Sequence, residues 1–184
     1  ALLGSGGRGR VVSAWDVLRG HEVALKLVHR QDLQDGGRIR EEFTFLQRLR
    51  HPGIVRVHDL GIAEGILHLS TDLVTGMTLD KWLAEEPTDA QVTRLLSRLL
   101  QTLSWLHGQG VLHGDLKPAN VLVRHVGAHW EPILIDFGLA RNASEPLLGG
   151  TPSFMAPALL RGESGGVHGD LYALHKSLDS WHTT

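Results

Sequence analysis

One short stretch, His113–Asn120, constrains the second half of this 184-residue chain more than any other. It reads His-Gly-Asp-Leu-Lys-Pro-Ala-Asn, and two apolar runs, Val111–Leu112 and Val121–Val123, flank it. Aliphatic and β-branched residues favour strands, so the pattern predicts a short loop held at both ends by strands. An acid, a base and an amide within one such loop indicate chemistry, because functional groups are commonly placed on loops that a rigid scaffold holds.

Composition excludes several classes of protein. The formal net charge is −2 and cysteine is absent, which argues against a polybasic nucleic-acid binder, a disulfide framework and a thiolate nucleophile. The twelve histidines are scattered without the spacing of a metal site. No apolar run approaches the ~20 residues that a membrane span needs. We therefore expect no membrane segment, and a cytoplasmic protein or the cytoplasmic part of a larger or membrane-tethered one. The chain begins at Ala1 rather than Met, so we expect its native start to lie upstream.

The first residues predict a hairpin followed by another strand. Leu2–Gly9 has glycines at positions 4, 6 and 9, which let a backbone approach an anion such as phosphate, although a flexible turn shows the same pattern. β-Branched residues follow instead of a helix, which disfavours a dinucleotide-binding fold. Glu22–Val28 alternates as a strand with Lys26 and Ala24 on one face. Lys26 is either a solvent-reaching edge lysine or a phosphate anchor.

A helix is predicted over Arg38–Leu49, with an apolar stripe that includes Ile39 and Leu46. Glu42 falls inside this stripe, three residues after Ile39 and four before Leu46. A carboxylate that faces the protein interior is costly unless it is paired, so we predict an ion pair between Lys26 and Glu42. If the helix phase differs by one residue, Glu42 only borders the stripe.

The next segments complete a small lobe. Ile54–Leu60 and Ile66–Val74 read as strands joined through Gly61–Gly65. They predict a mostly antiparallel sheet with one helix. We place the lobe boundary near Val74–Gly76.

Helices and a second set of strands follow. Leu79–Leu83 predicts a short helix, and Thr88–Gln91 predicts a capping box that opens a long one. The apolar face of the long helix is predicted to be Val92, Leu95, Leu96, Leu99, Leu100, Leu103 and Leu106. Ile133–Ile135 reads as a buried strand that ends at Asp136, an acid that either faces a metal or starts a turn. Asp170–Leu174 begins the last predicted helix.

Taken in order, these motifs resemble the signature set of protein kinases, and most closely the bacterial eukaryotic-like serine/threonine kinases. The matching segments are Gly4-x-Gly6-x-x-Gly9-x-Val11, Val23-Ala24-Leu25-Lys26, Glu42, His113-Gly-Asp115-Leu-Lys117-Pro-Ala-Asn120, Asp136-Phe137-Gly138, and Gly150-Thr151-Pro152 with Ala156-Pro157. The resemblance implies an α+β, bilobal kinase-like fold. Residues 1–74 would form the N-lobe, an antiparallel sheet plus one helix, and residues 75–184 a mainly helical, partial C-lobe lacking its last helices. We expect such a lobe to expose apolar surface and to be marginally stable or to need a partner.

The resemblance implies transfer of the ATP γ-phosphoryl group to a protein Ser or Thr hydroxyl, with Mg²⁺. Asp115 would orient the substrate hydroxyl and accept its proton, and Lys117 would neutralise charge on the γ-phosphoryl group. Asn120 and Asp136 would hold Mg²⁺. Nucleotide, metal and protein substrate are the implied partners.

The implied nucleotide site extends over both lobes. Lys26, oriented by Glu42, would hold the α- and β-phosphates. Residues Leu3, Gly4, Gly6 and Gly9 would belong to the glycine loop, Val11, Ala24 and Leu122 would enclose the adenine, Thr71 would be the gate residue, and the backbone at Asp72 and Val74 would hydrogen-bond the base.

One of the departures from the family's pattern bears on regulation. Gly114 stands where most kinases carry an Arg that pairs with a phosphorylated activation-loop residue. We therefore predict that activity does not need this pairing, and that removing a phosphate acceptor at Thr151 or Ser144 does not by itself abolish activity.

Two other functions stay open on the sequence. His-Gly-Asp and Ile135-Asp136 also occur in small-molecule phosphotransferases of the aminoglycoside or choline kinase type, although Lys117 and Thr151-Pro152 disfavour them. A pseudokinase that acts as a nucleotide-binding scaffold would suit an incomplete C-lobe. Its usual mark, loss of the lysine or of a metal ligand, is absent here.

Overall fold

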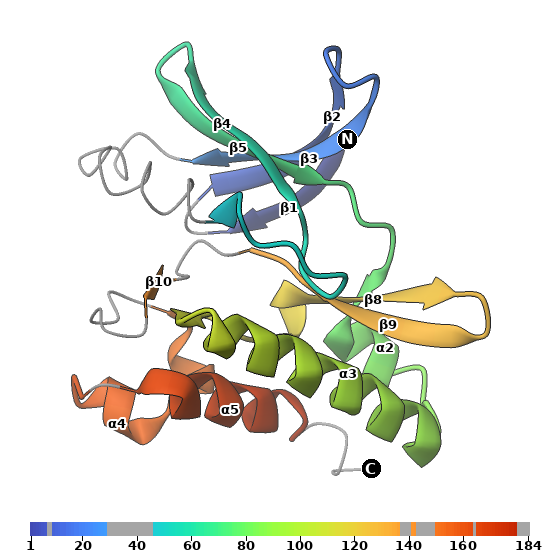
Figure 1. Cartoon of the computed structure of the whole chain (residues 1–184), viewed down its shortest axis with the longest axis vertical. Coiled ribbons are helices and arrows are strands. Elements are labelled where there is room, and N and C mark those ends of the chain that lie inside the picture. The colour runs from blue at the N-terminus through green and yellow to red at the C-terminus, as the bar shows by residue number, and fades with distance from the viewer. Residues whose placement is uncertain (7–8, 29–45, 137–140, 143–149, 164, 180–184) are drawn as a thin grey trace. The chain divides into compact units, whose positions relative to one another are not determined.

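A computed structural model describes residues 1–6, 9–28, 46–136, 141–142, 150–163 and 165–179 (Figure 1). The chain divides into two compact units. The first, here called the sheet unit, comprises Ala1–His51 and Val55–Thr75. The second, the helical unit, comprises Pro52–Ile54 and Gly76–Thr184.

The sheet unit is an antiparallel sheet in the order β1-β2-β3-β5-β4 (Figure 1). Its strands are β1 (Leu2–Gly6), β2 (Gly9–Asp16), β3 (His21–Val28), β4 (Val57–Ala63) and β5 (Ile66–Asp72). The strand predicted at Glu22–Val28 is confirmed as β3. Val23, Val57 and Leu67 are buried in this unit. Each such side chain contributes roughly 1.5–3 kcal/mol of burial free energy.

The β4–β5 hairpin is tighter than predicted. Ala63 pairs with Ile66, so the connection contains only Glu64 and Gly65, and the predicted Gly61–Gly65 loop is wrong. Both residues have positive φ, 50° and 75°, as short turns between twisted antiparallel strands require.

The bounds of β4 and β5 also differ from the prediction. The first strand begins at Val57 because Ile54 instead forms a bridge with Leu134 of the helical unit, to which it belongs. β5 ends at Asp72, two residues before the predicted end. The predicted Arg38–Leu49 helix lies outside the described residues except for positions 46–49.

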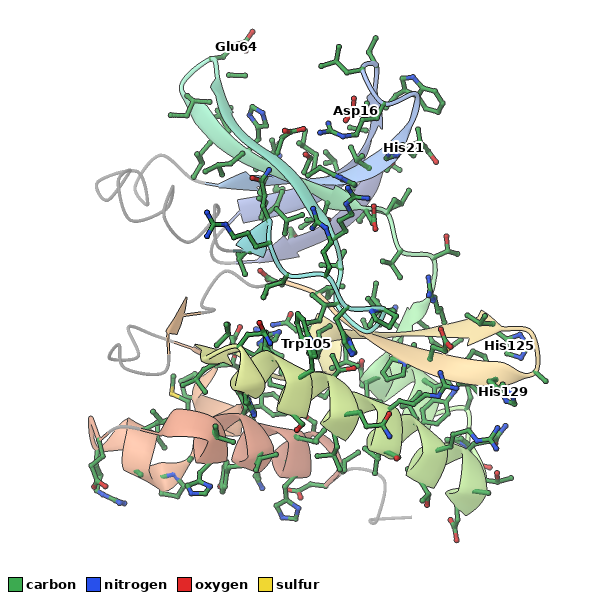
Figure 2. The ribbon with its side chains drawn as sticks, in the orientation of Figure 1. Asp16, His21, Glu64, Trp105, His125 and His129 are labelled. Atoms are coloured by element: carbon green, nitrogen blue, oxygen red, sulfur yellow. The ribbon has the colours of Figure 1, made fainter. Side chains whose placement is uncertain are left out.

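The helical unit combines short sheets with helices. Its strands are β6 (Met77–Thr78), β7 (Val111–Leu112), β8 (Val121–Val126), β9 (His129–Leu134) and β10 (Arg141–Asn142), which pair as β6-β8-β9 and β10-β7. Its helices are α2 (Leu79–Leu83), α3 (Asp89–Gly108), α4 (Pro157–Leu160) and α5 (Gly166–Ser177). One-turn 3₁₀ helices span Pro118–Asn120 and Pro152–Phe154. Figure 2 labels His125 and His129 at the β8–β9 hairpin. Next to His129, the ring of Trp130 packs edge-on against the ring of Trp82, with the two ring centroids 6.1 Å apart.

Helix α3 begins as predicted. The Thr88 hydroxyl accepts from the Gln91 N–H while the Gln91 side chain accepts from the Thr88 N–H, which is a complete capping box. Its buried stripe is narrower than predicted. The buried residues are Val92, Leu95, Leu99, Thr102, Leu103 and Leu106. Leu100 is 45% exposed, so its assignment to the buried face is wrong, because one residue beyond Leu99 the helix has already turned toward solvent.

Helix α5 starts at Gly166, four residues before the predicted start. Asp170 therefore lies inside the helix, and it is buried with Ala173, Leu174 and Ser177 on one face. The helices α3 and α5 lie side by side (Figure 1), and His107 of α3 contacts Asp170 of α5. Over the part of the chain that the structure describes, none of the helices is both long and apolar enough to cross a membrane.

Candidate active site

The predicted loop at His113–Asn120 is held between two strands. It follows β7, ends in the Pro118–Asn120 turn and leads directly into β8. Val111, Leu112 and Val121 at its ends are buried. Burial of these anchors fixes the loop ends, so the polar side chains between them start from a rigid frame.

Asp115, Lys117 and Thr151 form one hydrogen-bonded cluster. Asp115 Oδ1 accepts from the Thr151 N–H at 2.9 Å and from the Thr151 hydroxyl at 2.8 Å. The Lys117 ammonium donates to Asp115 Oδ2 and to Thr151 Oγ1, both at 2.8 Å. The Asp115 and Lys117 side chains are 15% and 24% exposed. The carboxylate is thus oriented by two neighbours and still reaches solvent, which suits a group that must meet a substrate hydroxyl.

Asn120 is buried and its amide is oriented by Asp115. Its Nδ2 donates to the Asp115 carbonyl at 2.8 Å, so the amide oxygen is the end left to act as a ligand. The Ile135 N–H donates to the Asn120 carbonyl at 2.9 Å, which places Asn120 beside the strand exit that carries Asp136. Asp136 is exposed and has a φ of 57°, a conformation that is uncommon outside glycine.

Those two side chains fit the metal that the kinase resemblance implies. An amide oxygen and a carboxylate are hard oxygen ligands of the kind that Mg²⁺ prefers. Among the described residues, no group of three or more His, Cys, Asp or Glu side chains could hold a metal ion.

His113 holds the loop in place through hydrogen bonds of both its ring nitrogens. It is fully buried, its Nε2 donates to the Ile135 carbonyl at 3.2 Å, and its Nδ1 accepts from the Asp115 N–H at 3.4 Å. The ring thus ties the backbone of Asp115 to the end of the strand before Asp136.

Asp170 anchors the same loop from α5. Its Oδ2 accepts from the His113 N–H at 2.9 Å and from His107 Nε2 at 2.8 Å, and its Oδ1 accepts from the Gly114 N–H at 3.0 Å. Burial raises the pKa of this carboxyl group, but the hydrogen bond from His107, the electrostatic attraction of His113 and the hydrogen bonds from the two backbone N–H groups outweigh burial, and the pKa lies below its ordinary value of 3.8. The carboxylate therefore stays charged where it holds the loop.

A small, partly open hollow of about 20 Å³ adjoins Asp115 and Thr151. Leu116, Phe154 and Met155 contribute to its mainly apolar lining. It lies entirely within the helical unit.

The predicted nucleotide-binding residues of the sheet unit lie on β1, β2, β3 and β5. Gly6 pairs with Gly9 at the end of the β1–β2 hairpin, and residues 7 and 8 between them are outside the described part. Val11 pairs with Lys26, and Ala24 pairs with Thr71. Leu3 is exposed on β1, and Gly4 has open space where a side chain would begin.

Asp72, the last residue of β5, is held from both neighbouring segments of the sheet, since it pairs with Val23 of β3 and its N–H donates to the Arg56 carbonyl at 2.9 Å. Its own carbonyl accepts a long 3.3 Å hydrogen bond from the Thr71 hydroxyl. Val74, two residues further along, is half-buried. Leu122, the remaining predicted adenine contact, lies on β8 of the helical unit, half-buried and paired with Ile133. Glu42 is outside the described residues, so the predicted Lys26–Glu42 pair stays a prediction.

Comparison with known families matches the chain to the protein kinase domain over residues 1–177. The chain belongs to this family, and the predicted bilobal kinase fold is confirmed. Serine/threonine-protein kinase PkaA of Streptomyces coelicolor is 38% identical over 154 residues, which cover 78% of this chain and 28% of PkaA. Calcium/calmodulin-dependent protein kinase type 1B of Homo sapiens is 34% identical over 178 residues, which cover 94% of this chain and 52% of that protein. Serine/threonine-protein kinase PknD of Mycobacterium tuberculosis is 34% identical over 184 residues, which cover 94% of this chain and 27% of PknD.

The resemblance to bacterial serine/threonine kinases that the motifs predicted is thus confirmed. The chain spans only about a quarter to a half of the length of these relatives. The activities that these names state belong to the named relatives.

Three residues of the helical-unit network were not predicted as site residues. Thr151 was noted as part of a Gly-Thr-Pro motif and as a phosphate acceptor, Asp170 only as a helix residue, and His107 not at all. A sequence signal existed for Asp170, since an acid that shares a helical face with Ala173 and Leu174 must find a partner. Nothing local marks the Thr151 hydroxyl or the His107 ring.

Proposed function

We propose that this chain is the catalytic domain of a serine/threonine protein kinase that transfers the γ-phosphoryl group of ATP to a Ser or Thr hydroxyl of a protein. The observation that carries the proposal is the cluster of Asp115, Lys117 and Thr151. It holds a carboxylate and an ammonium together on a loop whose ends are buried. Family membership supports the same reaction.

Each transfer residue has a role that its contacts support. The Asp115 carboxylate would orient the incoming hydroxyl and accept its proton, and Lys117 would place positive charge against the transferred group. Asn120 and Asp136 would hold Mg²⁺, which when bound neutralises charge on the phosphates. Little covalent work falls to the protein, so positioning and electrostatic stabilisation would supply most of the rate.

In the sheet unit, the β1–β2 hairpin would cover the phosphates and Lys26 would hold the α- and β-phosphates. Glu42 would orient Lys26. Val11 and Ala24 would contact the adenine ring together with Leu122 of the helical unit. The remaining proposed contacts are Leu3, Gly4, Gly6 and Gly9 of the glycine loop, Thr71 as gate residue, and the backbone at Asp72 and Val74.

A protein acceptor suits the site better than a small molecule. The mainly apolar surface that lines the small hollow beside Asp115 would contact an apolar side chain next to the phosphorylated residue. Lys117 and Thr151, which the small-molecule phosphotransferase alternative does not require, are both engaged with Asp115.

The test offers the chain ATP labelled at the γ-phosphate with Mg²⁺ and, in parallel, myelin basic protein, kanamycin and choline. We expect labelled phosphoserine or phosphothreonine on the protein only. Asp136→Asn, prepared identically, controls for contaminating kinases and should give no label. Label on kanamycin or choline, or ATP binding without transfer to any acceptor, would refute the proposal in favour of a small-molecule phosphotransferase or a scaffold, respectively.

A further inference from the structure

Strand β4 carries a bulge at His58. Val57 pairs with Thr71 of β5, and Asp59 pairs with the adjacent Ser70, so His58 is the extra residue between two consecutive partners. Bulges turn a side chain away from the regular alternation of a strand and occur often next to active sites.

Side chains satisfy the polar groups that the bulge leaves unpaired. The Asp59 N–H donates to the Ser70 hydroxyl at 3.0 Å, and Gln47 Nε2 donates to the His58 carbonyl at 2.5 Å. Ser70 and His58 are both buried, 6% and 8% exposed. A buried bulge whose His58 carbonyl and Asp59 N–H are both hydrogen-bonded has a defined shape, so the direction of the His58 ring is set by the fold.

The ring points to Asp72, the last residue of β5. His58 Nε2 lies 2.7 Å from Asp72 Oδ1, and because a carboxylate only accepts, Nε2 carries the proton. The Asp72 N–H donates to the Arg56 carbonyl on the other side of Val57. The ring of His21, labelled in Figure 2, packs against His58 with centroids 5.7 Å apart. Asp72 is therefore held by its backbone from Arg56, just before β4, and by its side chain from His58 within β4, while its backbone also pairs with Val23 of β3.

We propose that His58 is a positioning residue for nucleotide binding, which acts by holding the Asp72–Val74 backbone through the Asp72 carboxylate. The inference rests on the proposed function, which assigns the backbone of Asp72 and Val74 to the adenine. His58 does not touch the nucleotide in this scheme. It restricts the rotation of the peptide groups that touch the nucleotide, so that less conformational entropy is lost when the base binds.

Two substitutions separate this hydrogen bond from simple packing. His58→Ala removes the donor, and His58→Gln keeps an amide N–H with about the same reach as Nε2. We expect the Kd for ADP, measured by calorimetry, to rise about fivefold in His58→Ala and to stay within about twofold of wild type in His58→Gln. The KM for ATP should follow the Kd, while kcat at saturating ATP changes less than about twofold.

A matched control and a double substitution complete the design. Asp59→Ala, one residue along β4, breaks an exposed contact with Arg19 and should leave ADP affinity unchanged. Asp72→Ala should raise the Kd as much as His58→Ala, and the double variant should be no weaker than either single variant, because all three lose the same interaction.

Hydrogen exchange supplies a readout that needs no nucleotide. In the unliganded chain, the Asp72 amide should exchange faster in His58→Ala and return to the wild-type rate in His58→Gln. Equal exchange in all three proteins, or a His58→Gln variant as weak as His58→Ala, would overturn the positioning role even if ADP binds. A wild-type chain that binds neither ADP nor ATP would instead overturn the proposed function, whatever the exchange rates show.

Discussion

The two units hold their candidate residues by different means. In the sheet unit, Val11, Ala24 and Lys26 are placed by the hydrogen-bonded ladders of β2, β3 and β5. In the helical unit, Asp115 is oriented by the side chains of Lys117 and Thr151. The backbone hydrogen bonds of a strand pair remain when one side chain is removed. In a side-chain network, removing one side chain leaves the others without a partner that holds them in place.

Because of this difference, we expect substitutions in the two units to have different effects. Substitutions at the proposed nucleotide-binding positions should change function with little change in stability. Substitutions in the Asp115 network should change the proposed chemistry, the stability, or both. The following substitutions distinguish effects on function alone from effects on stability, and their expected size falls from the first to the last.

Asp115→Asn should give the largest loss. The amide cannot accept a proton from the substrate hydroxyl, so we expect kcat to fall by about 10³-fold. Steady-state kinetics with a protein acceptor would measure it, with Asp89→Asn at the exposed start of α3 as the matched control. An Asp115→Asn enzyme with more than a tenth of wild-type kcat would remove Asp115 from the proposed chemistry.

Lys26→Met should lower kcat/KM for ATP by about 10²-fold, because a positive charge on the phosphates is lost. The free energy of unfolding should change by less than about 1 kcal/mol, since the ladder of β3 with β2 and β5 remains. Urea titration and kinetics on the same preparation measure both. Arg10→Met, exposed on β2, is the control. Unfolding of the sheet unit in Lys26→Met would break the comparison between the two units.

Thr151→Val should lower kcat by about tenfold, because the carboxylate of Asp115 loses the hydroxyl that orients it. Thr151→Ser keeps that hydroxyl and should be near wild type. The two variants also test the prediction that activity does not need a phosphate on Thr151. A phosphate on Thr151 Oγ1 would meet the Asp115 carboxylate, so a loss in Thr151→Val reports the hydroxyl rather than a missing phosphate. Ser144, the other proposed phosphate acceptor, lies outside the described residues. Equal activity of all three proteins would contradict the role of the hydroxyl.

Local patterns predicted the fold well and the network poorly. β3, α2, the Thr88 capping box and the loop between β7 and β8 follow from residues within a few positions of one another. The β4–β5 turn was missed because its two-residue length depends on strand register. The contacts of Thr151 and Asp170 span 36 and 57 residues, a separation at which no periodicity or motif spacing constrains which atoms meet.

Asp170→Asn should lower the free energy of unfolding by about 1–3 kcal/mol, because an amide supplies one acceptor where the loop presents several donors. The difference should depend on pH. The folded pKa of Asp170 lies below 3.8, so the unfolded state binds more protons on acidification. Its stabilisation is therefore present above the ordinary carboxyl pKa and is lost as the pH falls through the lower folded value.

Urea midpoints of wild type and Asp170→Asn, measured from neutral pH to below pH 3.8, would test this dependence. We expect the two curves to converge only at the acidic end. A constant difference across the whole range would show that the charge of Asp170 does not stabilise the loop.

Gly114→Ala should have the smallest effect. Gly114 has a φ of 77°, where a Cβ atom costs about 1 kcal/mol, and its N–H is held by Asp170. The loop cannot relax to a negative φ without losing that hydrogen bond, so the cost should appear as a lower free energy of unfolding and a small loss of kcat. Gly108→Ala, at the end of α3 with open space for a Cβ, should be neutral or slightly stabilising. If both variants unfold at the wild-type urea concentration, the backbone of the loop is not fixed by Asp170, and the helical unit would position its residues no more rigidly than the sheet unit does.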